Sequence, residues 1–337
     1  MTHKIAVIMG GTSAERDVSL ITGQEIAGAL RRKGHQVFAI DCAFGDLLIE
    51  DLARDINEVI RPEHSNFEER KRELDRNLFK TIDFIHSRKI EVAFIALHGG
   101  YGENGQLQAL LELAGIPYTG SNSRASAVGM DKFMSKSLFR QVDIPVPESL
   151  TISSPADFSE ESLFVLGFPL VIKPNDQGST VGLTVVKEKA QLSPAIQKAF
   201  KYSDLVLAEK YIPGKEVTVS ILDHNALPVI EIIPEHGIYD YECKYQTGKS
   251  RYVVPAELPD NITYRLQELA QRPFQVLGCR HYARVDFRLG DSGTPYCLEV
   301  NTLPGMTSTS LVPKAARAIG IEFPELVEKI VNLAVSS

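Results

Sequence analysis

The chain has 337 residues, of which 44% are hydrophobic and 23% are charged. A chain of this length usually folds into more than one unit, each with its own hydrophobic core. Its 36 Lys and Arg against 43 Asp and Glu give a net charge of -7, which offers no general attraction to nucleic acid or to an anionic membrane. No stretch approaches about 18 uninterrupted apolar residues, so no membrane span is expected. We expect a cytoplasmic protein of two or three packed units, with no nucleic acid and no membrane as partner.

The cysteines exclude two other classes of protein. They are spread along the chain, without a Cys-x-x-Cys pair, at Cys42, Cys243, Cys279 and Cys297. This spacing fits neither a disulfide framework nor a zinc site, so we expect reduced and mostly buried thiols.

The N-terminal third alternates apolar runs with helical patterns. The strands expected there are residues 4–9, 36–40 and 91–97. A helix ending near Gly34 follows the first strand, and residues 66–88 read as surface helix. This alternation predicts a parallel sheet, which binds ligands at the carboxyl ends of its strands. Gly10-Gly11 and His98-Gly99-Gly100 both follow such strand ends.

The middle of the chain has a second pattern of strands and helices. After a loop at residues 117–123, one helix is expected from Ala125 to about Gln141. The strands expected next are residues 170–173, 183–186, 206–211, 217–221 and 229–233, the last two as an antiparallel hairpin. A Tyr-rich loop over 234–253 and a helix over 261–277 lead to a final hairpin.

The final hairpin predicts a metal site. Residues 281–289 and 294–301 flank a turn at 290–293. A register centred between Ser292 and Gly293 sets Asp286 opposite Glu299 and Arg284 opposite Asn301, all on one face. The other face then pairs Val285 with Val300 and Phe287 with Leu298, toward the core.

Two opposed carboxylates repel each other, and a divalent cation between them removes that repulsion. Two carboxylates and an amide oxygen are typical Mg²⁺ ligands. A solvated face of scattered charge is the alternative for a generic hairpin. The register, the neighbouring Arg284 and the loop from Asn301 to Gly305 favour the metal.

Lys132, Lys173 and a glycine loop over residues 177–182 form a second, cationic group. Glycines allow close approach of the backbone, and amide and hydroxyl groups can donate to phosphate oxygens. A Gly-rich turn explains the loop equally well. The chain has no Walker motif, and no dinucleotide motif follows the first strand.

The loop from Gly10 to Arg16 contains Glu15 at an expected helix start, where an acidic residue can simply favour the helix dipole. His98 differs from the other histidines because it follows a strand and precedes two glycines.

Taken in order, these motifs resemble those of the D-alanine–D-alanine ligases, members of the ATP-grasp superfamily, almost from end to end. The matching segments are Gly10 to Ser19, His98 to Gly105, Gly129 to Lys132, Ile172 to Pro174, Gly178 to Gly182, Tyr239 to Tyr245, Ala283 to Asp286 and Glu299 to Thr307. Thr180 and Asn104 replace the usual Ser and Asp, and both keep a polar side chain.

The resemblance implies a fold of α/β and α+β class, with an N-terminal parallel-sheet (preATP-grasp) domain followed by a two-part ATP-grasp fold. It implies an N-terminal substrate-binding domain over 1–122, a central ATP-grasp subdomain over 123–212 and a C-terminal ATP-grasp subdomain with the magnesium site over 213–337. A homodimer is also implied.

The resemblance also assigns a role to each site residue. ATP would be bound by Lys132, Lys173, Ser179, Glu209, Lys210, Ile212, Glu216 and Lys244. Within this set, Glu209 would contact the adenine amino group, Glu216 the ribose and Lys244 the γ-phosphate. Two Mg²⁺ ions, replaceable by Mn²⁺, would be held by Asp286, Glu299 and Asn301.

The amino-acid substrates would lie at the other end of the site. Glu15 would bind the ammonium of the first D-alanine, with His98 near its carboxylate, and Ser179 and Tyr245 would bridge to Glu15. The second D-alanine and the oxyanion would be surrounded by Arg284, Gly305, Ser310 and Leu311.

The implied activity is ATP-dependent ligation of two D-alanines through D-alanyl phosphate, for peptidoglycan precursors. A relative that joins D-alanine to D-lactate, D-serine or another amino acid is the close alternative, and Tyr245 favours D-alanine. A nucleotide-binding protein without activity would lack metal or phosphate residues. A biotin-carboxylase-like enzyme would not carry the Glu15 and Tyr245 loops.

Overall fold

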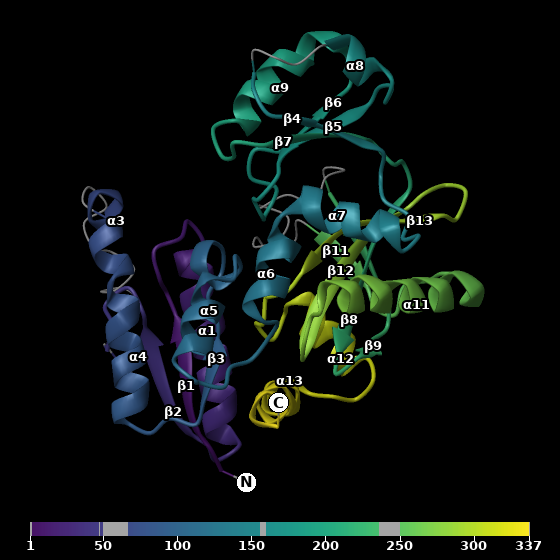
Figure 1. Ribbon diagram of the computed structural model, residues 1–337. Helices are drawn as coiled ribbons and strands as arrows, with labels where there is room; N and C mark the ends of the chain where they lie inside the picture. Colours follow the sequence, from purple (N-terminus) through teal and green to yellow (C-terminus); the bar gives the residue numbers. More distant parts are fainter. Residues whose placement is uncertain (1, 47, 50–66, 156–159, 236–249, 337) are drawn as a thin grey trace.

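The computed structural model describes residues 2–46, 48–49, 67–155, 160–235 and 250–336. These residues form three β-sheets with helices packed around them (Figure 1). Lys244, Tyr245 and Cys243 lie outside the described residues, as does most of the Tyr-rich loop. Cys42, Cys279 and Cys297 are free and buried, as the sequence predicts.

The first sheet is parallel and has the order β2-β1-β3. Its strands are β1 (Lys4–Met9), β2 (Gln36–Asp41) and β3 (Val92–Ile95). Ile5 pairs with Val37 on one side and Val92 on the other, and β1 and β3 are apolar because helices cover both faces. The predicted parallel sheet is confirmed. Its helices are α1 (Arg16–Arg32), α3 (Phe67–Asp75), α4 (Asn77–Ser87) and α5 (Gln106–Leu113), after the short η1 (Gly100–Gly102).

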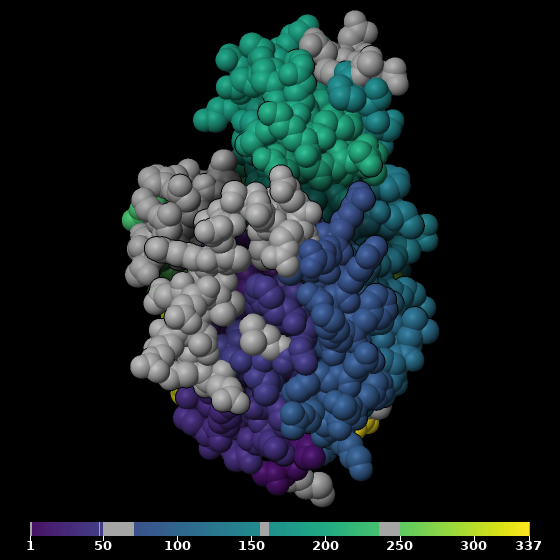
Figure 2. Space-filling model, turned by 90° about the vertical axis from the view of Figure 1, so that its left-hand side faces the viewer, coloured from purple at the N-terminus to yellow at the C-terminus, as the bar shows by residue number. Residues whose placement is uncertain are grey.

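The second sheet is antiparallel and has the order β4-β7-β5-β6. Its strands are β4 (Ser149–Ile152), β5 (Leu170–Pro174), β6 (Thr184–Val186) and β7 (Val206–Lys210). The helical elements α8 (Glu160–Phe164), η2 (Lys189–Gln191) and α9 (Leu192–Ala199) accompany it, and α9 packs on the sheet. Figure 2 shows this unit as a lobe above the N-terminal third.

The third sheet is antiparallel and has the order β11-β10-β8-β12-β13, with β9 paired to β8. Its strands are β8 (Lys215–Leu222), β9 (Asn225–Ala226), β10 (Ile230–Pro234), β11 (Ser250–Val253), β12 (Tyr282–Leu289) and β13 (Pro295–Asn301). The helices α6 (Ser123–Met130), α7 (Lys132–Gln141) and α11 (Asp260–Leu277) pack against it. The chain continues through α12 (Leu311–Arg317) to α13 (Phe323–Val335), which returns to pack against α1.

The region expected as one helix from Ala125 to Gln141 is two helices. Asp131 separates them because its backbone is extended, with ψ 100°, and its carboxylate accepts a hydrogen bond from Met134 N at 2.9 Å. Asp131 is therefore the N-cap of α7, a role that Asp fills well. The break places Lys132 at the first residue of a new helix.

The final hairpin has the predicted register at the end away from its turn, and a bulge shifts the register nearer the turn. Asp286 pairs with Glu299 and Arg284 with Asn301, as the sequence predicts. The predicted pairing of Phe287 with Leu298 is wrong, because the register shifts between Asp286 and Phe287, so that Phe287 pairs with Cys297. The extra residue in β13 sends Cys297 into the core and leaves Leu298 at a cavity wall. Bulges of this kind are common beside functional sites.

In the part of the chain that the structure describes, none of the helices has the length and apolar character needed to cross a bilayer.

Two glycines of α1 provide a matched test of the packing of this helix on β1. A Cβ at Gly23 would lie 2.6 Å from Met9 Cβ, whereas one at Gly28 would come no closer than 3.6 Å to a neighbour. Gly costs about 0.5–1 kcal/mol relative to Ala inside a helix. We expect Gly28→Ala to raise the free energy of unfolding by up to about 1 kcal/mol and Gly23→Ala to lower it by about 1–3 kcal/mol. Urea unfolding of the two variants measures both changes, and stabilisation by Gly23→Ala would contradict this packing.

Candidate active site

Two adjoining cavities lie where the three sheets meet. Cavity A has a volume of about 320 Å³ and lies between the first and third sheets, and cavity B has about 150 Å³ and lies between the second and third sheets. Their walls share Lys132, Gly178, Ser179 and Glu299. Ligands in the two cavities would therefore meet at these shared residues.

The described residues to which the sequence assigns a role all line these two cavities. Cavity A is lined by Glu15, His98, Arg284, Asn301, Gly305, Ser310 and Leu311. Cavity B is lined by Lys173, Glu209, Lys210, Ile212, Glu216 and Asp286. Lys244 and Tyr245 lie outside the described residues.

The loop that carries Glu15 is held by a buried ion pair. Arg16 donates to both carboxylate oxygens of Asp41, at the end of β2, and to the Gly11 carbonyl at 2.8 Å. Ser19 reaches from α1 to the Ala96 carbonyl at 2.8 Å. These contacts tie the first loop to both neighbouring strands, so Glu15 enters cavity A from a rigid support.

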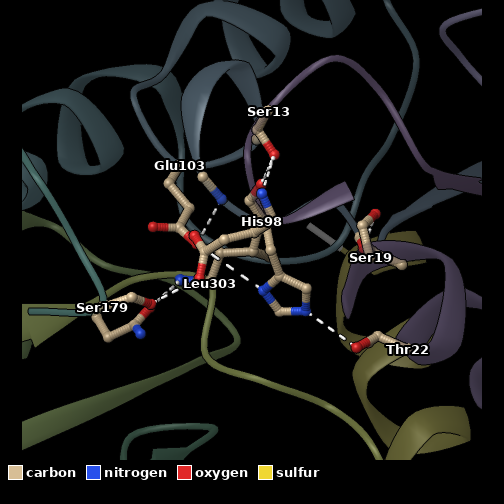
Figure 3. A network of polar contacts seen from close by, with 12 residues as sticks. Ser13, Ser19, Thr22, His98, Glu103, Ser179 and Leu303 are labelled. Carbon is tan, nitrogen blue, oxygen red and sulfur yellow. Dashed lines mark hydrogen bonds and ion pairs between the residues drawn. The ribbon is translucent and has the colours of Figure 1, made fainter. Parts of the chain in front are cut away.

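His98 is buried beside this loop, in the network that Figure 3 shows. Its Nε2 lies 3.0 Å from Thr22 Oγ1, and its Nδ1 lies 3.8 Å from the Glu103 carboxylate. Ser13 Oγ donates to the His98 carbonyl at 2.5 Å. Partners on both sides of the ring hold its orientation, and the two loops that follow β1 and β3 are joined.

The glycine loop of the second sheet meets the first sheet at one hydrogen bond. Ser179 Oγ donates to Glu15 Oε1 at 2.6 Å. Ser179 and Thr180 both have positive φ, of 50° and 58°, which is unusual for residues other than glycine. Backbone strain of this kind clusters at functional sites. The strain here brings the Ser179 hydroxyl to the boundary between the cavities.

The two opposed carboxylates of the hairpin, Asp286 and Glu299, are each paired with a cation. Arg284 donates from Nε and Nη2 to the two oxygens of Asp286, both at 2.8 Å. Lys132 Nζ lies 3.2 Å from Glu299 Oε2 and donates to the Gln177 carbonyl of the glycine loop at 2.7 Å. Paired cations remove the repulsion that two opposed carboxylates would otherwise have.

The donor set of this face suits a hard divalent cation. Asp286 and Glu299 are directly opposite on neighbouring strands, and Asn301 follows on the same face of β13. Asn301 Oδ1 accepts from Leu303 N at 3.0 Å, which leaves one lone pair for a metal. No group of three or more His, Cys, Asp and Glu with metal-binding geometry occurs among the described residues. Such a metal would therefore need Asn301 and ligand oxygens to complete its shell.

A buried cluster of two lysines and one glutamate forms part of the wall of cavity B. Glu209, 2% exposed, forms ion pairs with Lys136 through Oε1 and with Lys173 through Oε2, the latter at 2.9 Å. Burial alone would raise the pKa of Glu209, but the two ammonium groups lower it to about 2. Burial lowers the pKa of Lys136 to about 8, against the attraction of Glu209. Although burial opposes it, the attraction of Glu209 and Glu299 raises the pKa of Lys173.

Several residues that the sequence interpretation missed support this site. Thr218 on β8 lies with Oγ1 2.6 Å from Asp286 Oδ1. Asp75, at the end of α3, accepts from Thr12 at 2.5 Å and from Tyr101 at 2.6 Å, and so joins both loops of the first sheet. Helical spacing could have pointed to Lys136, four residues after Lys132, and strand periodicity to Thr218, two after Glu216. No local pattern marks Asp75.

Comparisons with known proteins agree with this arrangement. Residues 4–121 match the family model described as D-ala D-ala ligase N-terminus, and residues 138–332 match the D-ala D-ala ligase C-terminus. The D-alanine–D-alanine ligase of Syntrophotalea carbinolica is 44% identical over 97% of this chain and 94% of its own length. That of Moorella thermoacetica is 42% identical over 98% of this chain and 99% of its own length.

The fold is also similar to that of a solved relative. The crystal structure of D-alanine–D-alanine ligase from Bacillus anthracis, complexed with ATP, has a TM-score of 0.78 and 33% sequence identity, and covers 99% of this chain and 98% of its own. This chain therefore has the ATP-grasp fold that the family resemblance implies. The matches span nearly the whole length on both sides, and the chain therefore belongs to the D-alanine–D-alanine ligase family.

Proposed function

We propose that this protein is an ATP-dependent ligase that joins two D-alanines into D-alanyl-D-alanine, for peptidoglycan precursors. The observation that carries this proposal is the junction of the two cavities at Lys132, Ser179 and Glu299. A nucleotide in cavity B and an amino acid in cavity A would meet at these side chains. Phosphoryl transfer needs such a meeting point, because catalysis consists largely of positioning and charge neutralisation.

In cavity B we assign the nucleotide to a wall of lysines and glutamates. Lys132 and Lys173 would bind phosphate oxygens, and Glu209 the adenine amino group. Glu216, near Arg288 at 3.5 Å, would accept from the ribose hydroxyls. Lys210 and Ile212 would line the adenine, and Lys244 would reach the γ-phosphate. Asp286, Glu299 and Asn301 would hold two Mg²⁺ ions, or Mn²⁺, which would neutralise charge on the transferred phosphoryl group.

In cavity A we assign the first D-alanine to Glu15 and His98. The Glu15 carboxylate, oriented by Ser179, would pair with the ammonium group, and Tyr245 would complete that bridge. The second D-alanine would lie beside Ser310 and Leu311, with its amine directed toward the first. Arg284 and the Gly305 backbone would stabilise the oxyanion.

The two steps then follow from this placement. A carboxylate oxygen of the first D-alanine attacks the γ-phosphorus, the bond to the bridging oxygen breaks, and ADP leaves. The amine of the second D-alanine attacks the acyl carbon of D-alanyl phosphate, and inorganic phosphate leaves. Acyl phosphates react with water, and the contact between the glycine loop and Glu15 would help to exclude solvent from the intermediate.

Three further assignments rest on the family resemblance. We propose domain boundaries at residues 122 and 212, a homodimer, and a location in the cytoplasm. Packing crosses these boundaries, because α6 and α7 of the proposed central subdomain lie against the third sheet and α13 of the proposed C-terminal subdomain lies against α1. Size-exclusion chromatography with light scattering measures the number of subunits.

Thr218 provides a test of the metal assignment. Thr218→Val keeps the side-chain volume but removes the hydroxyl beside Asp286. Partners that orient metal ligands typically contribute 10–100-fold in metal affinity, so we expect the Mg²⁺ concentration at half-maximal activity to rise about tenfold. Thr218→Ser, which keeps the hydroxyl, serves as the matched control and should stay near wild type. Equal Mg²⁺ dependence in all three proteins would argue against Asp286 as a ligand.

The substrate assignment has a direct assay. We expect the purified protein to release ADP and phosphate with D-alanine, and to form a dipeptide, because we assign cavity A to the two amino acids and cavity B to ATP. D-serine and D-lactate, each supplied with D-alanine, test the second position. The D-alanine assignment predicts D-alanyl-D-alanine as the main product. A mixed product made in preference to it would support the alternative acceptor instead, and nucleotide turnover without D-alanine would contradict the ligase itself.

A further inference from the structure

Lys136 is a buried lysine that lines neither cavity but contacts Glu209, a residue in the wall of cavity B. The Lys136 side chain is 1% exposed and forms an ion pair with Glu209, whereas Glu209 and Lys173 both line cavity B. Among the described residues that line cavities A and B, Lys136 does not occur. A charge with so little contact with water costs free energy unless it is compensated, so its presence calls for a reason.

The two lysines of α7 point to different parts of the site. Lys132 and Lys136 are four residues apart, on one face of the helix, and both are buried. Lys132 extends to Glu299 and the Gln177 carbonyl, at the junction of the cavities. Lys136 extends to Glu209 on β7. Asp131 is the N-cap of this helix, so the position of that cap determines where both lysine side chains lie.

The two cations of Glu209 are not equivalent. Lys173 lines cavity B, where its ammonium could bind the phosphate oxygens of a nucleotide. A nucleotide that engages Lys173 would take that cation away from Glu209. Lys136 is enclosed and would remain. Without it, Glu209 would be a buried carboxylate that shares its remaining cation with the nucleotide, which favours the protonated form.

The ionisation of Glu209 determines which base it accepts. An ionised carboxylate has acceptors only, and matches the amino group of adenine. Guanine carries a carbonyl oxygen at the corresponding position, which two carboxylate oxygens would repel. A protonated carboxyl has one O–H donor, and could bind that carbonyl. A cation that keeps Glu209 ionised therefore contributes to selection of the base.

We infer that Lys136 is a positioning residue for base selectivity, which holds Glu209 ionised and oriented so that the site takes adenine nucleotides in preference to guanine nucleotides. This inference rests on the proposed contact between Glu209 and adenine. It gives Lys136 a role in nucleotide choice without any contact with the nucleotide. Lys173 thereby remains available for the phosphates.

The test is the ratio of kcat/KM for ATP to that for GTP, measured at saturating D-alanine and Mg²⁺. Lys136→Met removes the charge and keeps most of the apolar chain. A hydrogen bond from the adenine amino group to an ionised carboxylate is stronger than one to a neutral carboxyl, so we expect a loss of about tenfold or more in this ratio. The KM for ATP should rise, and the KM for D-alanine should change little, because cavity A does not include this cluster.

Three further variants make the result specific. Lys136→Arg keeps the cation and should keep most of the selectivity. Arg140→Met removes an exposed cation one turn later on α7, and should behave as wild type. Glu209→Gln replaces one acceptor oxygen with an amide donor and should lower the ratio by itself. Thermal unfolding of each protein reports the fold, and Lys136→Gln replaces the methionine variant if that protein does not fold.

The outcomes distinguish the role of Lys136 from the proposed contact between Glu209 and adenine. A lowered ratio in Glu209→Gln with an unchanged ratio in Lys136→Met would overturn the role of Lys136 and leave the adenine contact in place. Unchanged ratios in both would overturn the contact between Glu209 and adenine, and the inference with it. A lowered ratio in both, with selectivity retained in Lys136→Arg, is the result that the structure predicts.

Discussion

The pairing of β12 with β13 on one side and β8 on the other determines the chemistry of this site. It sets Asp286 and Glu299 opposite each other and brings Thr218 against Asp286. Two carboxylates at this spacing need positive charge, which comes from Arg284 on the same strand and from Lys132 on α7. The same balance recurs at Glu209, between Lys136 and Lys173. Each acidic group of cavity B named here is thus held by a cation from a defined element.

These charges come from α7 and from the second and third sheets, and the contacts between the three sheets assemble the site. The glycine loop of the second sheet touches the first sheet through Ser179 and Glu15, and touches α7 through Gln177 and Lys132. The loops of the first sheet are joined to each other by Ser13 and the His98 carbonyl. A displacement of one sheet would therefore alter both cavities. The shape of both cavities therefore depends on these hydrogen bonds, which hold the loops of different sheets in fixed positions.

Much of this arrangement can be predicted from sequence where the pattern is local. The apolar runs of β1 and β3 predict a parallel sheet with covered faces, and the spacing of the last hairpin predicts the pairs Asp286–Glu299 and Arg284–Asn301. The bulge at Leu298 was missed because Cys297 and Leu298 are both apolar, so that an inward apolar side chain fits either register. The break at Asp131 was missed because apolar spacing continues across it. Asp75 acts through Thr12 and Tyr101, which are far away in the chain, and no local periodicity marks it.

The most direct test of the central idea is a crystal structure of this protein with Mg²⁺ and a non-hydrolysable ATP analogue. The account predicts Mg²⁺ within about 2.0–2.1 Å of oxygens from Asp286, Glu299 and Asn301, bridged to the phosphates, with the base beside Glu209. An analogue bound elsewhere, or hairpin carboxylates that remain on Arg284 and Lys132 while the metal is held by other groups, would contradict it.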